Sequence, residues 1–141
     1  LHVEITNLII PDMNDSKDDL NTLCEWVVDN LGQDTPIHFS AYHPDFKMPS
    51  KKRTPYETLN LAYDVAKEAG VSFPYVGNIK HEKGGNTYCP NCGHLLIGRS
   101  GYRFNQINID KDKICPNCGY DLKNDIIGEI NTSPSHRFMF I

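Results

Sequence analysis

Long hydrophobic runs and an excess of positive charge are both missing from this chain of 141 residues. No stretch approaches the roughly 18 consecutive apolar residues that a membrane-spanning helix requires, so the sequence predicts no membrane partner. The formal net charge of −4 at pH 7 argues against a nucleic-acid-binding surface. An apolar content of 39% suffices for one ordinary domain, or for a small domain plus a metal-stabilised module.

Cysteine is also scarce outside two short motifs. Of the five cysteines, four form two Cys-x-x-Cys pairs, and Cys24 falls on the apolar stripe of a predicted helix, where we expect a small core residue. Paired cysteines of this kind indicate a metal site in a reducing compartment rather than a disulfide framework. We therefore expect a cytoplasmic protein.

The first half of the chain alternates between strand and helix patterns. β-branched and alternating residues predict three strands, at His2–Ile10, Ile37–His43 and Val71–Val76. Between them, apolar residues at helical spacing predict two helices, which end at Gly32 and Gly70. This order predicts right-handed βαβ units and a parallel sheet.

Each predicted helix has a start signal. For the first helix, cap oxygens are offered by Asn14, Asp15 and Ser16, and negative charge in the first turn by Asp18 and Asp19. Thr54-Pro55-Tyr56-Glu57 predicts a capping box for the second helix, with proline at its first position. Pro74 predicts an edge or bulge position in the third strand.

Two of the predicted strands have one polar side. Glu4 and Thr6 alternate with apolar residues in the first strand, and His38 and Ser40 do so in the second. Parallel strands covered by helices on both faces are apolar throughout, so we expect helices on one face only. The fold class predicted is α/β, with three parallel βα units of a partial (half) TIM-type barrel whose polar face lines a cavity. The alternative is a polar face that is solvated, or buried and hydrogen-bonded.

The ends of the predicted strands indicate where a site would lie. Active sites of β/α barrels collect at the carboxyl ends of the strands, which here carry Asn7, His43 and Asn78. The second strand would therefore deliver His43 to the mouth of the cavity. A histidine before a proline also fits a purely structural role.

The second half of the chain predicts a small metal module. Gly84-Gly85, in a polar stretch, predicts a domain boundary, which gives βα units over residues 1–84, a rubredoxin-like four-cysteine zinc ribbon over 85–122 and a tail over 123–141. The apolar end of the tail, residues 138–141, is expected to dock on another surface. The sequence Cys-Pro-Asn-Cys-Gly occurs twice and supplies the predicted metal ligands Cys89, Cys92, Cys115 and Cys118.

Zinc is the first choice for this metal. Iron in a rubredoxin-like site, or an iron–sulfur cluster, uses the same ligand type and stays an alternative. A closed site of four thiolates leaves no position for a substrate, so its expected role is folding and docking.

Several segments together resemble a known family. They are "LHVEITNLIIP", "HFSAYHPDFKM", "TPYETL", "YVGN" and "NTYCPNCGHLLIGRSGYR". In this order, over residues 1 to 120, they are similar to the C-terminal part of radical S-adenosylmethionine enzymes of the AmmeMemoRadiSam system, relatives of pyruvate formate-lyase activating enzymes. The resemblance implies a partial β/α barrel and oxidoreductase or activating chemistry, in which a [4Fe-4S] cluster cleaves S-adenosylmethionine reductively.

The resemblance also implies roles for individual residues. His43 matches a histidine near the adenosyl group of the cofactor in such enzymes. The residues expected to line the cofactor cavity with it are Glu4, Thr6, Ser40, Asn78 and His81.

One departure from the family is large. The three-cysteine motif Cys-x-x-x-Cys-x-x-Cys, which holds the cluster in these enzymes, does not occur in this sequence. We therefore expect the chain to be inactive alone and to need the N-terminal half of the barrel, from the same gene or a separate chain. A strand pattern that starts at once from Leu1 favours a longer protein, and a protein substrate is a further candidate partner.

Two other hypotheses stay open. The ribbon could be a binding module on an α/β scaffold, docking a protein or, less in keeping with the acidic charge, a nucleic acid. The chain could also be a zinc-stabilised protein that dimerises by sheet pairing.

Overall fold

The computed structural model describes residues 2–45, 50–101, 103–126 and 130. The chain divides into two compact units, Leu1–Gly84 and Gly85–Ile141. Most of the predicted tail, including the apolar residues 138–141, lies outside the described residues. Within the described part, no helix combines the length and the apolar character needed to cross a membrane.

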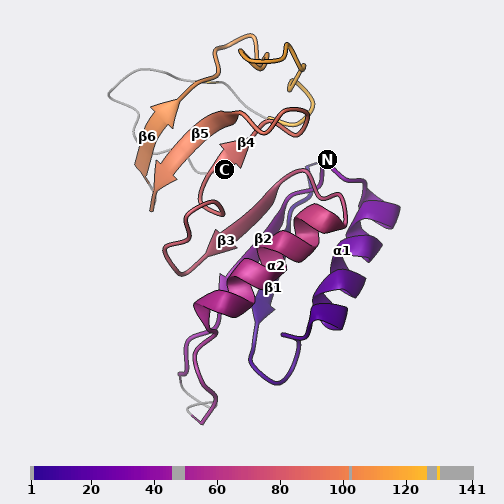
Figure 1. The fold of residues 1–141 in the computed structure, drawn as a ribbon, viewed down its shortest axis with the longest axis vertical. Helices are drawn as coiled ribbons and strands as arrows, with labels where there is room; N and C mark the ends of the chain where they lie inside the picture. The colour runs from indigo at the N-terminus through magenta and orange to yellow at the C-terminus, as the bar shows by residue number, and fades with distance from the viewer. Residues whose placement is uncertain (1, 46–49, 102, 127–129, 131–141) are drawn as a thin grey trace. The chain divides into compact units, whose positions relative to one another are not determined.

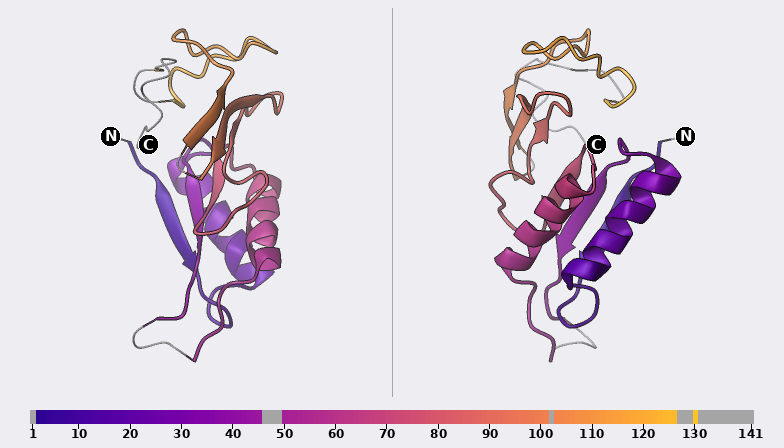
Figure 2. Two further views of the ribbon diagram at one scale, coloured as in Figure 1. Left: turned by 90° about the vertical axis from the view of Figure 1, so that its left-hand side faces the viewer. Right: turned by 45° about the vertical axis from the view of Figure 1, so that its right-hand side comes forward.

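The first unit is a parallel sheet with two crossover helices, as the sequence predicts (Figure 1). Strands β1 (Ile5–Ile9), β2 (Ile37–Ala41) and β3 (Pro74–Gly77) pair in the order β1-β2-β3. Helix α1 (Lys17–Leu31) joins the first two strands, and α2 (Tyr56–Glu68) joins the second two. Figure 2 shows both helices on the same side of the sheet.

The core lies between these helices and one face of the sheet. Ile37 and Phe39 of β2 are fully buried there, and Leu20, Cys24 and Val27 of α1 are buried with them. Cys24 is thus a core residue, as predicted, and burial raises the pKa of its thiol to about 11. The alternating polar side chains, such as those of Thr6, His38 and Ser40, point to the opposite face of the sheet.

The two helices begin differently. Of the three candidate cap residues, Ser16 caps α1, since its Oγ accepts a hydrogen bond from the Asp19 N–H at 3.1 Å. The predicted capping box of α2 is wrong, because Pro55 occupies the N-cap and no side chain caps that helix. The Thr54 hydroxyl bonds instead to the ends of β1 and β2.

Strand β3 lies at one end of the three-strand order, which agrees with its proline. The chain after it turns back, so that the Val76 N–H donates to the Gly84 carbonyl at 2.9 Å. His81, in this returning loop, accepts a hydrogen bond from the Gly84 N–H at Nδ1. Its ring stacks on Tyr56 and packs against Tyr63, both from α2.

The second unit contains a small antiparallel sheet. Strands β4 (Thr87–Tyr88), β5 (Leu95–Ser100) and β6 (Arg103–Ile107) pair in the order β4-β5-β6. Among its described residues, Leu96 and Leu122 are fully buried, and Ile97 and Ile109 are nearly so. The turn after Leu122 continues this unit, because the amides of Asp125 and Ile126 both donate to the Leu122 carbonyl.

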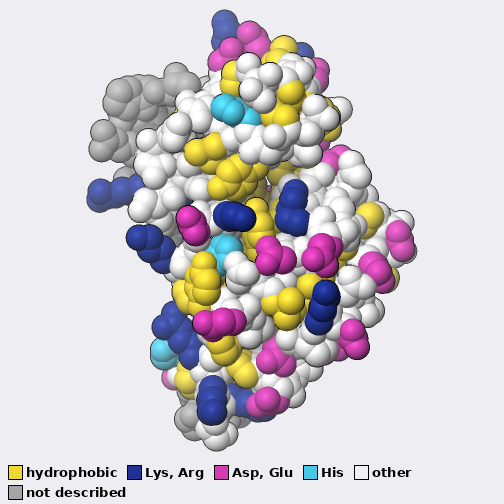
Figure 3. All heavy atoms as spheres, viewed as in Figure 1, with side chains coloured by type: hydrophobic (Ala, Val, Ile, Leu, Met, Phe, Trp, Pro, Cys, Tyr) yellow, Lys and Arg dark blue, Asp and Glu magenta, His cyan; other side chains and the backbone are white. Residues whose placement is uncertain are grey.

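Charged side chains are mixed over the surface seen in Figure 3, where acidic and basic groups alternate across the face shown. This distribution agrees with the modest net charge of −4. A mixed surface of this kind is typical of solvated protein faces rather than of a site that attracts one sign of charge.

Gly84 offers a test of the returning loop. A Cβ at this position would lie 2.6 Å from the Val76 Cβ and 2.9 Å from His81 Nδ1. We expect Gly84→Ala to lower the free energy of unfolding by about 1–3 kcal/mol, the usual cost of overpacking. Urea denaturation followed by circular dichroism measures this change.

Gly77→Ala is the matched control, because the nearest atom to its added Cβ would be Ser40 Oγ at an ordinary 3.6 Å. Equal unfolding free energies for the two variants would contradict the tight packing at Gly84.

Candidate metal centre and polar sheet face

Two identical turns present the four cysteines of the second unit. In the first, the Gly93 N–H donates to the Cys89 carbonyl at 2.8 Å; in the second, the Gly119 N–H donates to the Cys115 carbonyl at 2.9 Å. Gly93 and Gly119 have φ of 72° and 75°, a region that favours glycine. The repeated glycine thus allows each turn to place two thiolates on the same side.

The four sulfur atoms form one compact cluster. The Sγ atoms of Cys89, Cys92, Cys115 and Cys118 all lie within 4.8 Å of one another. The Cys89–Cys118 and Cys92–Cys115 pairs are both 3.7 Å apart. A tetrahedral ion with metal–sulfur bonds of about 2.3 Å places its sulfurs about 3.8 Å apart. The cluster therefore fits a single Zn²⁺ or iron ion, whereas a multi-iron cluster, with each cysteine on a different iron, would spread the thiolates further.

Two asparagines connect the turns across this cluster. Asn91 Nδ2 of the first turn donates to Cys118 Sγ of the second at 3.4 Å, and Asn117 Nδ2 donates to Cys92 Sγ at the same distance. The hydrogen bond from Asn91, with one from the Tyr120 backbone, lowers the pKa of Cys118 to about 6. Hydrogen bonds from Asn117 and the His94 backbone likewise lower the pKa of Cys92.

Burial divides the cysteines into two kinds. Cys89 and Cys115 are buried, whereas Cys92 and Cys118, the second cysteine of each turn, are exposed. Burial is the main reason why the pKa of Cys89 rises to about 12. A bound cation would stabilise the thiolate form of all four. Four thiolates complete a tetrahedral shell, so the arrangement suits a structural ion rather than one that binds a substrate.

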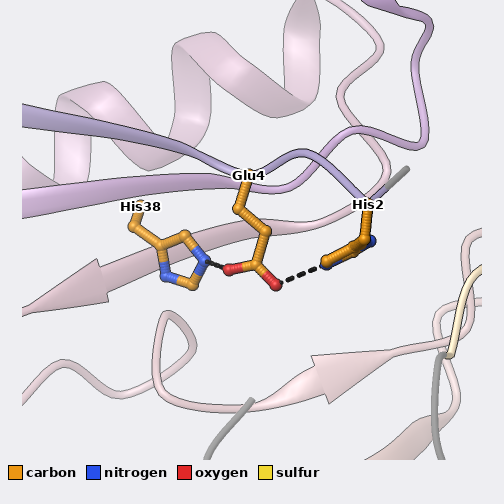
Figure 4. A network of polar contacts seen from close by, with 3 residues as sticks. All are labelled: His2, Glu4 and His38. Carbon is orange, nitrogen blue, oxygen red and sulfur yellow. Dashed lines mark hydrogen bonds and ion pairs between the residues drawn. The ribbon is translucent and has the colours of Figure 1, made fainter.

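A second cluster lies on the polar face of the first unit. Figure 4 shows His2, Glu4 and His38 together on the side of the strands away from the helix drawn there. Glu4 Oε1 lies 2.7 Å from His2 Nε2, and Glu4 Oε2 lies 2.8 Å from His38 Nε2. Partial burial raises the pKa of Glu4, but hydrogen bonds from both histidines, together with their charge, outweigh it and hold this pKa below its ordinary value.

The register of the strands places further polar groups on the same face. Thr6 lies opposite His38, and His38 lies opposite Tyr75, whose ring it stacks on with centroids 5.0 Å apart. Ser40 follows two residues after His38, between Leu8 and Gly77. The structure therefore places Glu4, Thr6 and Ser40 of the predicted cavity residues on one face, with Ser40 farther along the strands than the other two.

The other predicted cavity residues lie elsewhere in this unit. His43 and Asn78 follow the carboxyl ends of β2 and β3, and both are exposed; Asn78 Nδ2 makes a long 3.4 Å hydrogen bond to the Ala41 carbonyl. His81 differs from the prediction, since it packs on α2 and is only 8% exposed. Burial lowers the pKa of this imidazole. Asn7 also differs, because β1 continues to Ile9 and leaves Asn7 inside the strand, in register with Phe39.

Three features of these sites were not predicted as functional from the sequence. His38 belongs to the polar alternation that identified Ser40, so the signal for it was available. The cross-bonding asparagines repeat at the same place in both cysteine motifs, which is also visible in the sequence. Thr54 carried a strong helix-cap pattern, and no local signal pointed to the strand ends instead.

Comparison with known proteins places the chain beside one longer archaeal protein. It is 48% identical over 118 residues to an uncharacterized protein of Methanocaldococcus jannaschii. The match covers 83% of this chain and 35% of that relative, so the chain spans about a third of the length of the curated relative it matches. No family profile and no solved structure matches the chain.

The asparagine bridges predict a measurable contribution to metal binding. We expect Asn91→Ala and Asn117→Ala each to weaken Zn²⁺ affinity by about 10- to 100-fold, the usual effect of removing a hydrogen bond to a metal ligand. Competition with a chromophoric chelator at fixed pH measures the affinity. Asn124→Ala, which removes an exposed amide of the same unit, is the control. Affinities that stay within twofold of the wild type in both variants would show that the bridges do not matter.

Proposed function

We propose that the first unit is part of an incomplete β/α barrel of a radical S-adenosylmethionine enzyme with oxidoreductase or activating chemistry. One observation carries this proposal: helices cover a single face of the parallel sheet, and the other face holds the His2–Glu4–His38 cluster with Thr6 and Ser40. A polar sheet face inside a βα architecture suits a barrel lumen that holds a ligand.

The free edge of the sheet supports the same proposal. In the part of the chain that the structure describes, β1 pairs only with β2, and its other edge has no partner strand. The side chain of Leu8, on the polar face of this strand, is 44% exposed. An edge strand with exposed apolar groups is ordinarily covered. Further strands of a barrel would cover both the edge and the polar face.

The similarity to a longer protein is compatible with such further strands. The archaeal relative has about two-thirds of its length outside the matched region. In our proposal, an N-terminal half of the barrel, from the same gene or from a separate chain, is the partner of this unit, and a protein substrate is a further candidate.

The chain offers groups for S-adenosylmethionine but not for the cluster. His43 and Asn78, at the carboxyl ends of β2 and β3, lie where ligands bind in open parallel sheets. S-adenosylmethionine, bound with a reduced [4Fe-4S] cluster, supplies the radical chemistry of this family. Four of the five cysteines form the compact single-ion site and Cys24 is buried in the core, so the ligands of such a cluster would come from outside this chain.

We propose zinc as the metal of the second unit, with a role in folding and in docking. The sulfur spacing and the complete tetrahedral shell both suit this ion. The small sheet β4–β6 would depend on the ion for its stability, because the described part of the unit buries few large apolar side chains: Leu96, Ile97, Ile109 and Leu122.

Metal analysis tests this part of the proposal. We expect the purified chain to contain one zinc ion and to lack visible absorbance. Zinc removal by a chelator should abolish the ordered structure of residues 85–126 but leave α1 and α2 intact, as amide exchange by NMR would show. A coloured preparation with stoichiometric iron would contradict zinc as the resident ion.

Cofactor binding tests the radical enzyme proposal. In the complete protein that contains this chain, we expect S-adenosylmethionine to bind and His43→Ala to weaken binding about tenfold, which corresponds to about 1.4 kcal/mol. Isothermal titration calorimetry under anaerobic conditions measures the dissociation constant, and release of 5′-deoxyadenosine after dithionite reduction measures cleavage.

Asp29→Asn, on the exposed surface of α1, is the control for a general effect of substitution. Absence of binding by the wild-type complete protein would end the proposal, and unchanged affinity in His43→Ala would remove this histidine from the site.

A further inference from the structure

One short segment contacts the carboxyl ends of all three parallel strands. Residues 51–54, which we name the crossing segment, precede α2. Lys51 Nζ donates to the Pro11 carbonyl, just after β1, at 3.3 Å. Arg53 donates to the carbonyl of Asn78, just after β3, at 3.4 Å. Thr54 forms hydrogen bonds to the last residue of β1 and to the first residue beyond β2.

Thr54 is the buried residue of this segment, and both its side chain and its backbone form hydrogen bonds. It is 2% exposed, and its hydroxyl makes two short hydrogen bonds. Thr54 Oγ1 accepts from the Tyr42 N–H at 2.7 Å and donates to the Ile9 carbonyl at 2.6 Å. Its own N–H donates to the Tyr42 carbonyl at 3.1 Å. Both the side chain and the backbone of this residue thus bind the first residue beyond β2.

The hydroxyl lies where the pairing of β1 and β2 ends. The ladder begins where the Ile5 N–H donates to the Pro36 carbonyl, and parallel pairing repeats every two residues. The next bond after the Ile9–Ala41 pair would therefore run directly from the Tyr42 N–H to the Ile9 carbonyl. Thr54 Oγ1 stands between these two groups and bonds to both. The hydroxyl thus joins the last residue of β1 to the first residue beyond β2.

We infer that Thr54 is a positioning residue for the candidate cofactor site, an inference that rests on the proposed function. Ligands of open α/β sheets bind outside the carboxyl ends of the strands, where Thr54 lies. Tyr42, which Thr54 holds by two hydrogen bonds, is followed directly by His43. The hydroxyl therefore fixes the backbone from which the exposed His43 ring extends.

Only a side chain with a hydroxyl can fill this role at this size. Valine has the same shape as threonine, but it lacks the oxygen that bonds to the Tyr42 N–H and the Ile9 carbonyl. Serine keeps the oxygen and loses one methyl group. Thr54→Val and Thr54→Ser thus separate the hydrogen bonds from the packing.

The affinity of the complete protein for S-adenosylmethionine tests the inference. We expect Thr54→Val to weaken binding about tenfold and Thr54→Ser to stay within about twofold of the wild type. The Thr54→Val/His43→Ala double variant should bind no more weakly than His43→Ala alone, because both changes remove one contact. A loss that is purely structural would instead add to that of His43→Ala.

A second measurement uses the present chain and needs no cofactor. Thr54→Val should raise the exchange rate of the Tyr42 amide with deuterium by at least about tenfold and shift the NMR resonances of His43. The exchange rate of the Leu20 amide, within α1 of the same unit, is the internal control for intact folding. If Thr54→Val does not fold, Thr54→Ala replaces it in both experiments.

The outcomes are distinguishable. Wild-type affinity in a folded Thr54→Val protein, or losses that add in the double variant, would overturn the inference while the proposed function stands. If the wild-type complete protein does not bind S-adenosylmethionine, the proposed function fails and the link between Thr54 and this ligand fails with it. Unchanged Tyr42 exchange would overturn the claim that the hydroxyl fixes this backbone, whatever the ligand.

Discussion

Burial of a single face of the parallel sheet is the constraint on which the first unit depends. Because α1 and α2 both pack on the side that carries Ile37 and Phe39, every second residue of the strands is free of the core. Thr6, His38 and Ser40 occupy such positions beside the exposed Leu8, and Glu4 lies just before β1. Strands buried on both sides would carry valine and isoleucine there instead. Among these polar groups, Glu4 joins two histidines that come from different segments.

The sequence predicted this unit well where the signal was periodic. Alternation along residues 37–41 gave both the strand and its two faces, and the apolar spacing of α1 and α2 gave the helices. The failures concern contacts between distant residues. Thr54 has the local pattern of a helix cap, but its hydroxyl gains more from buried strand ends than from an exposed helix end. From its place in a loop after β3, His81 was expected to line the cavity. Its contacts with two tyrosines of α2 depend on how this loop turns back toward β3, which the local sequence does not reveal.

The metal centre was predictable for a different reason. Its ligands come in two local turns with fixed spacing, so only the distance between the turns depends on the fold. The number of ions, in contrast, follows from the sulfur positions, because a spacing of 3.7 Å in two of the pairs suits one tetrahedral ion. Zinc and iron both bind four thiolates, so elemental analysis of the purified chain distinguishes them.

The asparagine amides that reach across the cysteine cluster bear on how the second unit assembles. Each turn supplies two sulfurs, but the amide that stabilises the exposed sulfur of one turn belongs to the other. Neither turn therefore holds the complete environment of its own ligands. During synthesis the first turn leaves the ribosome well before the second, so stable capture of an ion must wait until the chain has been made as far as Cys118.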